Sequence, residues 1–366
     1  MITTLYDTTT AAIADKLVEI REQGGATSLS RVLTLVVMVG ADAAETAVKA
    51  SNFASMEHPC RVIVLVERDR EGSAALDAEI RVGGDAGASE VVILRLRGPI
   101  IDHTNTLILP LLLPDAPIVA WWPDRAPDDP SLDSVGALAT RRVTDAYRGT
   151  APLQDRLRHL SVSYAPGDTD LAWTRITWWR AHIAAMLEVH AASMPSGGPD
   201  AGDLGPGGPD RRNVARATTG EPDGDHDSLS QVSGGEDWAN ATAGVAGADI
   251  TGGPNHASLD LMAAWLTLRL GCPTTITRID GVDSLTGVTL RYTDGTAMSL
   301  HRPDGSRVAT LTVPGAEPRE ISLARRTVPE CLAEELRRLD ADEMYGQVVT
   351  AGLPLLWERQ GVTHGA

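Results

Sequence analysis

Short, continuous apolar segments separated by helical segments constrain the fold of this chain more than any other feature. Three of them, RVLTLVVMVG (31–40), RVIVLVE (61–67) and SEVVILRLRG (89–98), are rich in β-branched residues. A strand that is apolar on both sides is buried on both faces, which is typical of a parallel sheet covered by helices. The first part of the chain is therefore predicted to be α/β, with a mostly parallel sheet and flanking helices.

A fourth apolar segment, PIVAWW (117–122), ends in two adjacent tryptophans. The two-residue period of a strand places Trp121 and Trp122 on opposite faces of the sheet, so this strand is predicted to be central. Both residues fall at the carboxyl end of the strand, the edge where open α/β sheets bind ligands or partners. Two interpretations stay open: a plug that closes this edge, or a surface that contacts a partner.

The second half of the chain has a different pattern. Alternating segments are separated by Asp294-Gly295 and Asp304-Gly305, which suit tight hairpins of type I′ because both central residues of that turn need a positive φ. With REISLARR (319–326) added, the pattern predicts an antiparallel meander of about four strands. We therefore expect the α/β part to be followed by an α+β domain.

Composition marks the boundary between the two halves. Residues 192–256 hold 14 glycines and 6 prolines, a content typical of disorder. The predicted organisation has four parts: an α/β (Rossmann-like) domain at 1–150, connecting helices at 151–191, a disordered Gly/Pro/Asp-rich linker or insertion at 192–256, and an α+β domain with the antiparallel meander at 257–366.

Charge and cysteine content limit the class of protein. The net charge of −17 repels phosphate backbones and anionic lipid surfaces, so we expect no nucleic-acid or membrane partner. The three cysteines are far apart and form no C-x-x-C motif. The sequence has neither a secretory signal nor an apolar run of about 18 residues, which predicts a cytoplasmic protein.

Motifs that would dictate a reaction are missing from the sequence. Gly40 follows the first apolar strand but lacks the further glycines of a dinucleotide-binding loop. His58 and Arg61 flank a proline where a helix gives way to a strand; they are a weak candidate for an anion pocket, and a simple chain reversal is the alternative. We predict no catalytic residue, no metal site and no cofactor.

A second pair of tryptophans lies in the helical segment 171–188. Trp179 falls on its apolar stripe, whereas Trp178 lies among polar neighbours that include Arg175. An indole in that position is partly exposed unless another element covers it. The cover could be the second domain or a separate protein.

Several segments together carry a resemblance to a known family. HPCRVIVLVE, AEIRVGGDAGASEVVILRL, LPLLLPDAPIVAWWP, RRVTDA, LAWTRITWWRAHIA and LRRLDADEMYGQVV look like the glucose-6-phosphate dehydrogenase assembly proteins, the OpcA family. The resemblance implies a non-catalytic partner that binds this dehydrogenase and promotes its active oligomer in the oxidative pentose phosphate pathway. On this basis the candidate contact residues are Trp121, Trp122, Arg141, Arg142, Arg175 and Trp178.

A rival hypothesis comes from the α/β pattern alone. It is an enzyme or sensor that binds a sugar phosphate or nucleotide near Gly40, His58 and Arg61. The resemblance also links cyanobacterial members to thioredoxin-dependent control, for which the spacing of Cys60, Cys272 and Cys331 gives no independent support.

Overall fold

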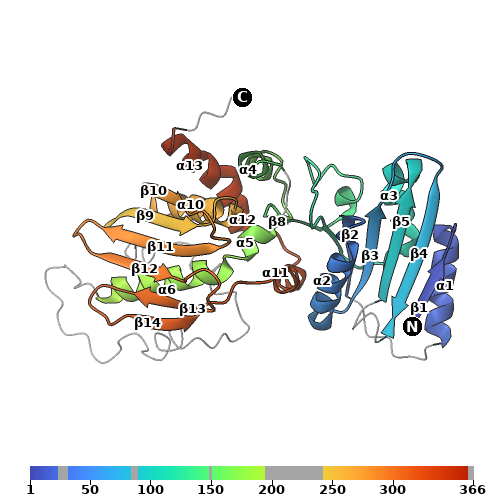
Figure 1. The fold of residues 1–366 in the computed structure, drawn as a ribbon, viewed down its shortest axis with the longest axis horizontal. Coiled ribbons are helices and arrows are strands. Elements are labelled where there is room, and N and C mark those ends of the chain that lie inside the picture. The colour runs from blue at the N-terminus through green and yellow to red at the C-terminus, as the bar shows by residue number, and fades with distance from the viewer. Residues whose placement is uncertain (24–31, 84–89, 148–150, 194–241, 362–366) are drawn as a thin grey trace. The chain divides into compact units, whose positions relative to one another are not determined.

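The chain folds into two units. A computed structural model describes residues 1–23, 32–83, 90–147, 151–193 and 242–361. Unit 1 comprises Met1–Thr174 and Arg326–Thr350, and unit 2 comprises Arg175–Arg325 and Ala351–Ala366. The segment Arg326–Thr350 thus belongs to unit 1, although the sequence alone groups it with residues 257–366. Figure 1 shows the elements of both units.

Unit 1 is built on an eight-stranded, mostly parallel sheet, which confirms the predicted fold class. All neighbouring strands from β5 to β8 in the spatial order are parallel, whereas β4 runs antiparallel to both β1 and β5. The spatial order is β1 (Ile2–Leu5), β4 (Ala75–Val82), β5 (Glu90–Arg97), β3 (Cys60–Glu67), β2 (Leu33–Gly40), β6 (Ile118–Trp121), β7 (Arg141–Thr144) and β8 (Asp168–Asp170).

Helices cover both faces of this sheet, and Figure 1 shows α1 and α2 on opposite sides of it. One face carries α2 (Ala44–Glu57), α5 (Leu171–Thr174) and α11 (Val328–Arg337). The other carries α1 (Thr10–Gln23), η2 (Gly98–His103), α3 (Thr104–Ile108) and η3 (Leu109–Leu111). The rest of unit 1 includes η4 (Gly136–Leu138), α4 (Leu153–Val162) and α12 (Glu343–Gln347).

Alternate residues of the central strands feed two apolar clusters, one on each face. Val37 and Trp121 lie in the cluster under α2 and α11, and Val36 and Trp122 lie in the cluster under α1. The predicted division of Trp121 and Trp122 between the two faces is therefore confirmed. Close packing below Trp122 also explains Gly136, because a Cβ atom there would overlap the Pro130 carbonyl oxygen and would lie 3.1 Å from Cη2 of the indole.

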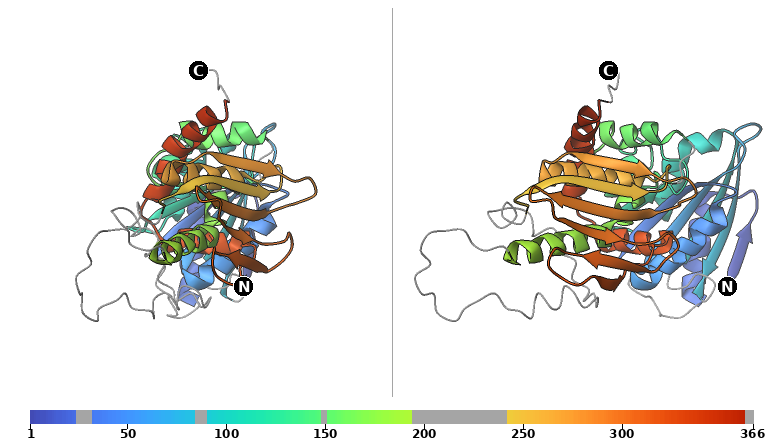
Figure 2. Two further views of the ribbon diagram at one scale, coloured as in Figure 1. Left: turned by 90° about the vertical axis from the view of Figure 1, so that its left-hand side faces the viewer. Right: turned by 60° about the vertical axis from the view of Figure 1, so that its left-hand side comes forward.

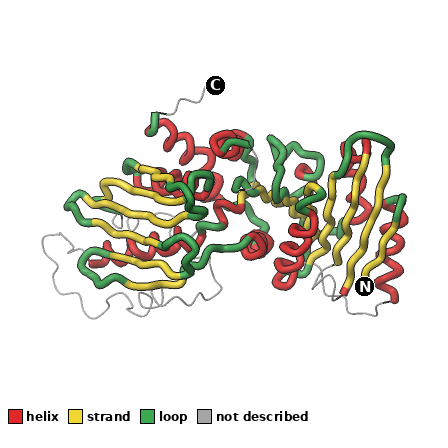
Figure 3. The backbone as a smooth tube through the Cα atoms, in the orientation of Figure 1, coloured by secondary structure: helices red, strands yellow, loops and turns green. Residues whose placement is uncertain are grey.

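Unit 2 is built on a six-stranded sheet in which only the β9–β10 pair is parallel. Strands β11 to β14 form the antiparallel meander that the sequence predicts. The spatial order is β10 (Thr274–Arg278), β9 (Val245–Gly252), β11 (Leu285–Tyr292), β12 (Ala297–His301), β13 (Val308–Thr312) and β14 (Arg319–Ser322). Figure 3 shows these strands as one continuous sheet.

Two helices cover one face of the second sheet, as Figure 2 also shows. In α6 (Thr177–Ser193), the His190 ring lies 4.4 Å from the ring of Tyr292 on β11. In α10 (Ala257–Leu270), Leu259 packs on Gly252 at the end of β9. A π-helical turn (Val348–Gly352) leads into α13 (Leu353–Arg359), which packs on α10.

The opposite face of this sheet is mostly polar, with side chains that are half-buried or exposed and with Val308 of β13 as an exposed apolar residue. We call it the open face, and it is made by Asp249, Thr251, Thr275, Thr277, Thr289, Arg291, Ser299, His301, Thr310 and Thr312. Their neighbours along each strand, such as Ile250 and Leu290, are buried on the helix-covered face. This alternation is expected of a sheet that faces solvent on one side.

Strand β9 corrects one boundary of the sequence interpretation. The predicted disordered linker at 192–256 includes Val245–Gly252, which pairs with both β10 and β11. Glycine and alanine obscured this strand in the sequence, and Gly247 lies under the guanidinium of Arg291, whose Nη2 would be 2.8 Å from a Cβ atom at this position. Residues 194–241, the larger part of the predicted linker, lie outside the described residues.

The hairpin turns are not of the predicted type I′. Gly295 and Gly305 have φ values of +84° and +75°, but the aspartates that precede them have negative φ. In the first hairpin, Tyr292 N donates to Thr296 O over 2.9 Å and leaves a three-residue loop. A three-residue loop places only one residue in the left-handed region, and here that residue is the glycine. The Asp-Gly pair therefore supplies one residue with a positive φ and not the two that a type I′ turn needs.

Candidate partner-binding site

The tryptophans of β6 are core residues. Trp121 and Trp122 are 1% and 3% exposed, and each is enclosed by the apolar cluster on its own face of the sheet. Neither indole offers a surface to a partner in this structure. The sequence left open whether these indoles close the edge of the sheet or contact a partner. Their burial agrees with the first interpretation.

The two arginines of β7 are buried in ion pairs within unit 1. Arg141 pairs with Glu335 of α11 and donates from Nη1 to Asp340 O over 2.7 Å. Arg142 pairs with Asp168 of β8 and donates from Nη2 to Pro166 O over 2.6 Å. Both guanidinium groups are therefore committed to partners inside the unit and hold neighbouring elements together.

The remaining two predicted contact residues lie in unit 2. Arg175 is 8% exposed, whereas Trp178 of α6 is half-buried. The next residue, Trp179, is 2% exposed and has the Arg302 guanidinium 5.4 Å from its ring centroid. The predicted assignment of Trp179 to the core is confirmed, and Trp178 keeps the most accessible indole among the predicted contacts.

The three residues of the predicted anion pocket do not come together. Arg61 pairs with Thr34 at the amino end of the parallel β2–β3 ladder, whereas Gly40 lies at its carboxyl end, opposite Glu67. Six residues of strand separate the two positions, which is about 20 Å at a rise of about 3.3 Å per residue. His58 precedes β3 and therefore lies at the amino end as well.

Arg61 is also committed to other groups. Its Nη2 lies 2.9 Å from Glu90 Oε2, and its Nη1 donates to Leu111 O over 2.5 Å. Gly40 instead faces Arg125 of the loop after β6, since a Cβ atom there would lie 2.9 Å from Arg125 Nη2. The predicted pocket of Gly40, His58 and Arg61 is thus wrong as a single site.

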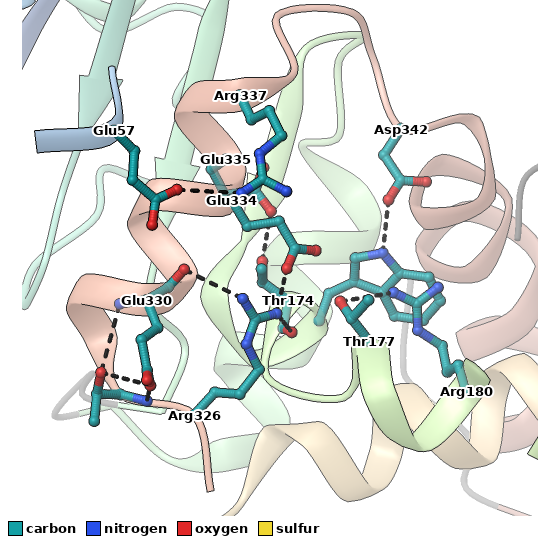
Figure 4. A network of polar contacts seen from close by, with 12 residues as sticks. Glu57, Thr174, Thr177, Arg180, Arg326, Glu330, Glu334, Glu335, Arg337 and Asp342 are labelled. Carbon is teal, nitrogen blue, oxygen red and sulfur yellow. Dashed lines mark hydrogen bonds and ion pairs between the residues drawn. The ribbon is translucent and has the colours of Figure 1, made fainter. Parts of the chain in front are cut away.

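A polar network fastens α11 to unit 1, and the sequence interpretation did not identify it. Glu335 is buried and accepts from both Arg141 and the Thr174 hydroxyl, the latter over 2.5 Å. Burial raises the pKa of Glu335, and the positive charge of Arg141 opposes that shift. Figure 4 shows Glu335 and its neighbours on α11.

The same network includes the ends of α11. Thr327 and Glu330 form a capping box at its first turn, and Glu57 at the end of α2 lies 3.1 Å from Arg337 in the last turn. Trp173 Nε1 donates to Asp342 over 2.8 Å just beyond the helix. These contacts hold α11 beside α2 on the sheet of unit 1 (Figure 4).

The outward side of α2 carries an apolar surface that the sequence interpretation missed. Phe53 and Met56 are 39% and 60% exposed, and Lys49 precedes them on the same side of the helix. We call these three residues the α2 ridge. Their spacing of four and three residues was the signal available in the sequence, because such positions share one side of a helix.

Neither a metal centre nor a membrane span is evident in the part of the chain that the structure describes. Within it, no group of three or more His, Cys, Asp or Glu side chains could hold a metal ion. Among the same residues, no helix combines the length and apolar composition needed to cross a membrane.

Comparison with known families decides the relationship of this chain. A model of the N-terminal domain of a glucose-6-phosphate dehydrogenase subunit matches residues 51–161, and a model of the C-terminal domain matches residues 236–349. Together they cover more than half of the chain. The chain belongs to the OpcA family of glucose-6-phosphate dehydrogenase assembly proteins.

The two OpcA models divide the candidate residues. Phe53 and Met56 of the α2 ridge fall inside the N-terminal model, whereas Arg175 and Trp178 fall in the segment that neither model matches. The C-terminal model extends through α11, which packs in unit 1. A comparison with curated proteins gives no match.

Proposed function

We propose that this OpcA-family chain is a non-catalytic assembly factor and allosteric activator of glucose-6-phosphate dehydrogenase. It binds the dehydrogenase in the cytoplasm and promotes its active oligomer, which supplies the oxidative pentose phosphate pathway. The match of both halves of the chain to OpcA domain models carries this proposal. To activate its partner, the chain has to prefer one state of the dehydrogenase, because equal affinity for two states shifts no equilibrium.

The α2 ridge is the contact surface that we favour. Aromatic residues and methionine are enriched at the centres of protein interfaces, whereas serine and threonine are under-represented among the residues that dominate binding energy. This criterion favours Phe53 and Met56 over the hydroxyl-rich open face of unit 2. Phe53 and Met56 of the ridge also lie within the matched N-terminal domain, as a surface with a family-wide role requires.

Trp178 remains the second candidate contact. It is half-buried and has an aromatic ring suited to an interface, but it lies outside both matched domains. The predicted contacts Trp121, Trp122, Arg141 and Arg142 enter this proposal only as residues that support the fold from inside unit 1. In the same way, we propose that the parallel sheet is a Rossmann-like scaffold for α2 and that it binds no dinucleotide.

Co-purification with the dehydrogenase from the same organism tests the proposal, followed by mass measurement of the complex. We expect a complex of defined stoichiometry with the parent chain, and its absence under all conditions would refute the function. Phe53→Asp is expected to weaken binding at least about ten-fold, which corresponds to the loss of one interface hot spot. Leu132→Asp is the matched control, because Leu132 is 80% exposed in a loop of the same unit.

The variant Trp178→Ala separates the two candidate surfaces. If Trp178→Ala weakens binding and Phe53→Asp does not, the contact surface lies on α6 and the ridge is excluded. If neither variant changes binding while the complex still forms, both surfaces are excluded and the function stands.

A further inference from the structure

Paired acidic residues lie at both ends of the outward side of α2. Near its start, Glu45 Oε2 lies 3.3 Å from Arg81 Nη2 of β4. At its end, Glu57 Oε2 lies 3.1 Å from Arg337 Nη2 of α11 (Figure 4). Lys49 is the third charged residue of α2, and it is exposed and forms no ion pair with any described residue. The outward side of this helix therefore keeps one uncompensated positive charge.

The helical period places this charge beside the two apolar side chains of the α2 ridge. At about 100° per residue, Lys49 lies about 40° from Phe53 and about 20° from Met56 around the helix axis. Phe53 is about 6 Å further along α2, at a rise of about 1.5 Å per residue. The buried residues of α2, among them Ala47 and Ala54, lie on the opposite side. A partner that covers Phe53 therefore also meets the ammonium group of Lys49.

The strands next to α2 carry a ladder of ion pairs on the same side of the sheet. Strand β4 alternates between half-buried and buried residues, as expected of a strand covered on one face only. Glu79 pairs with Arg81 over 2.6 Å and with Arg95 of β5 over 2.7 Å. Asp77 lies 3.6 Å from Arg97 of β5. Both carboxylates of this ladder are committed to arginines of unit 1, so the surface around the α2 ridge suits an acidic partner better than a basic one.

This inference rests on the proposed function and adds the chemistry of the contact. We propose that the α2 ridge binds an acidic segment of the dehydrogenase, in which a carboxylate pairs with Lys49 and a neighbouring apolar side chain packs on Phe53 and Met56. The apolar contact excludes water, and an ion pair is stronger where the dielectric constant is lower. The net charge of −17 repels an acidic partner as a whole. Local complementarity at Lys49 therefore determines which segment of the dehydrogenase binds rather than how fast the two proteins meet.

A charge reversal at Lys49, measured at two salt concentrations, tests the ion pair. In Lys49→Glu we expect binding to the dehydrogenase from the same organism to weaken at least about ten-fold at about 0.05 M salt, because two carboxylates then face each other. At about 1 M salt the difference from the parent should fall to about two-fold or less, because the Debye length shrinks to about 3 Å. Loss of an apolar contact alone would weaken binding equally at both salt concentrations. Isothermal titration calorimetry with the two full-length proteins measures the dissociation constants.

The variant Lys16→Glu is the matched control. Lys16 lies on α1, which covers the other face of the sheet of unit 1, and its Nζ lies 2.8 Å from Glu19 Oε2. This variant carries the same change in net charge as Lys49→Glu. We expect it to bind within about two-fold of the parent at both salt concentrations, because the exchanged charge is remote from α2.

Several outcomes would overturn the inference while the complex still forms. They are equal binding of Lys49→Glu and the parent at low salt, tighter binding of Lys49→Glu, an equal loss in Lys16→Glu, and a loss in Lys49→Glu that persists unchanged at high salt. Absence of a complex with the parent chain would refute the proposed function itself and this inference with it. If Lys49→Glu fails to fold, Lys49→Gln removes the same positive charge, and we expect a smaller loss of affinity that high salt abolishes.

Discussion

The sheets of unit 1 and unit 2 differ in how many faces are covered. In unit 1, β2 and β3 are buried along almost their whole length because helices lie on both sides. In unit 2, the second half of β11 and all of β12 alternate between buried apolar residues and the half-buried or exposed residues of the open face. A run of apolar residues therefore indicates a doubly covered strand, and strict alternation indicates a strand covered once.

The comparison also bears on where a partner binds. The open face is large but lined by hydroxyl groups, whereas the ridge on α2 is small and apolar. If exposed area alone decided where a partner binds, the open face would be the better candidate. The chemistry of the side chains makes the α2 ridge the better candidate. If covered and open surfaces differ in this way, matched substitutions on the two kinds of surface should differ in their cost to stability.

The largest difference is expected between two Arg–acid pairs, one on each kind of surface. Glu335→Ala leaves the guanidinium of Arg141 buried without its carboxylate, which costs about 3–5 kcal/mol of unfolding free energy. Asp249→Ala breaks the pair with Arg291 on the open face and costs less than about 1 kcal/mol. Urea denaturation measures both, and similar losses would show that the open face is covered in solution.

The pH dependence of stability is expected to originate in the covered side of unit 2. Burial first, and then the positive charges of Arg175 and Arg325, lower the pKa of His256 to about 3. The unfolded chain binds this proton near pH 6.5 and the folded chain does not, so stability is lost as pH falls from 6.5 toward 3. Between pH 7 and pH 5 the loss is about 2 kcal/mol.

The variant His256→Gln is the control for that loss. It removes the titrating ring, so its unfolding free energy should change less between pH 7 and pH 5 than that of the parent. Buried acids of unit 1 act in the opposite direction, because burial raises the pKa of Asp170 and the folded chain keeps its proton longer. If the unfolding free energies of the parent and His256→Gln depend on pH in the same way, His256 is not the source of the loss of stability below pH 7.

The smallest effects are expected from one reciprocal pair of near-isosteric exchanges. Val64→Thr places a hydroxyl in the fully buried β3 strand and costs about 1.5 kcal/mol. Thr289→Val on the open face of β11 changes stability by no more than about 0.5 kcal/mol. Thermal unfolding of both variants measures the two changes in stability. A loss of stability for Thr289→Val as large as that for Val64→Thr would refute the difference between the covered sheet of unit 1 and the open face of unit 2.

The sequence was sufficient where hydrophobic periodicity decides the structure. Continuous apolar runs predicted the core strands of unit 1, and alternation predicted the meander of unit 2. Strands β7 and β8 escaped prediction because their residues are polar and become buried through ion pairs such as Arg142–Asp168. Their burial depends on a partner distant in sequence, which periodicity does not reveal.

The candidate site was harder to predict for a related reason. Sequence reasoning selected Trp121 and Trp122 by residue type, but helices and loops cover both indoles. It overlooked Phe53 because a single phenylalanine on an amphipathic helix is ordinary core in most proteins. Whether a helix face is covered depends on the return of α11 to unit 1, and that return is a tertiary event.

A titration of glucose-6-phosphate dehydrogenase with the purified chain tests the central claim most directly. The account predicts that dehydrogenase activity rises, saturates at a fixed ratio of chain to enzyme and is accompanied by a shift toward a larger oligomer. Dehydrogenase activity and oligomer size that stay constant at every ratio, with both proteins folded, would contradict it.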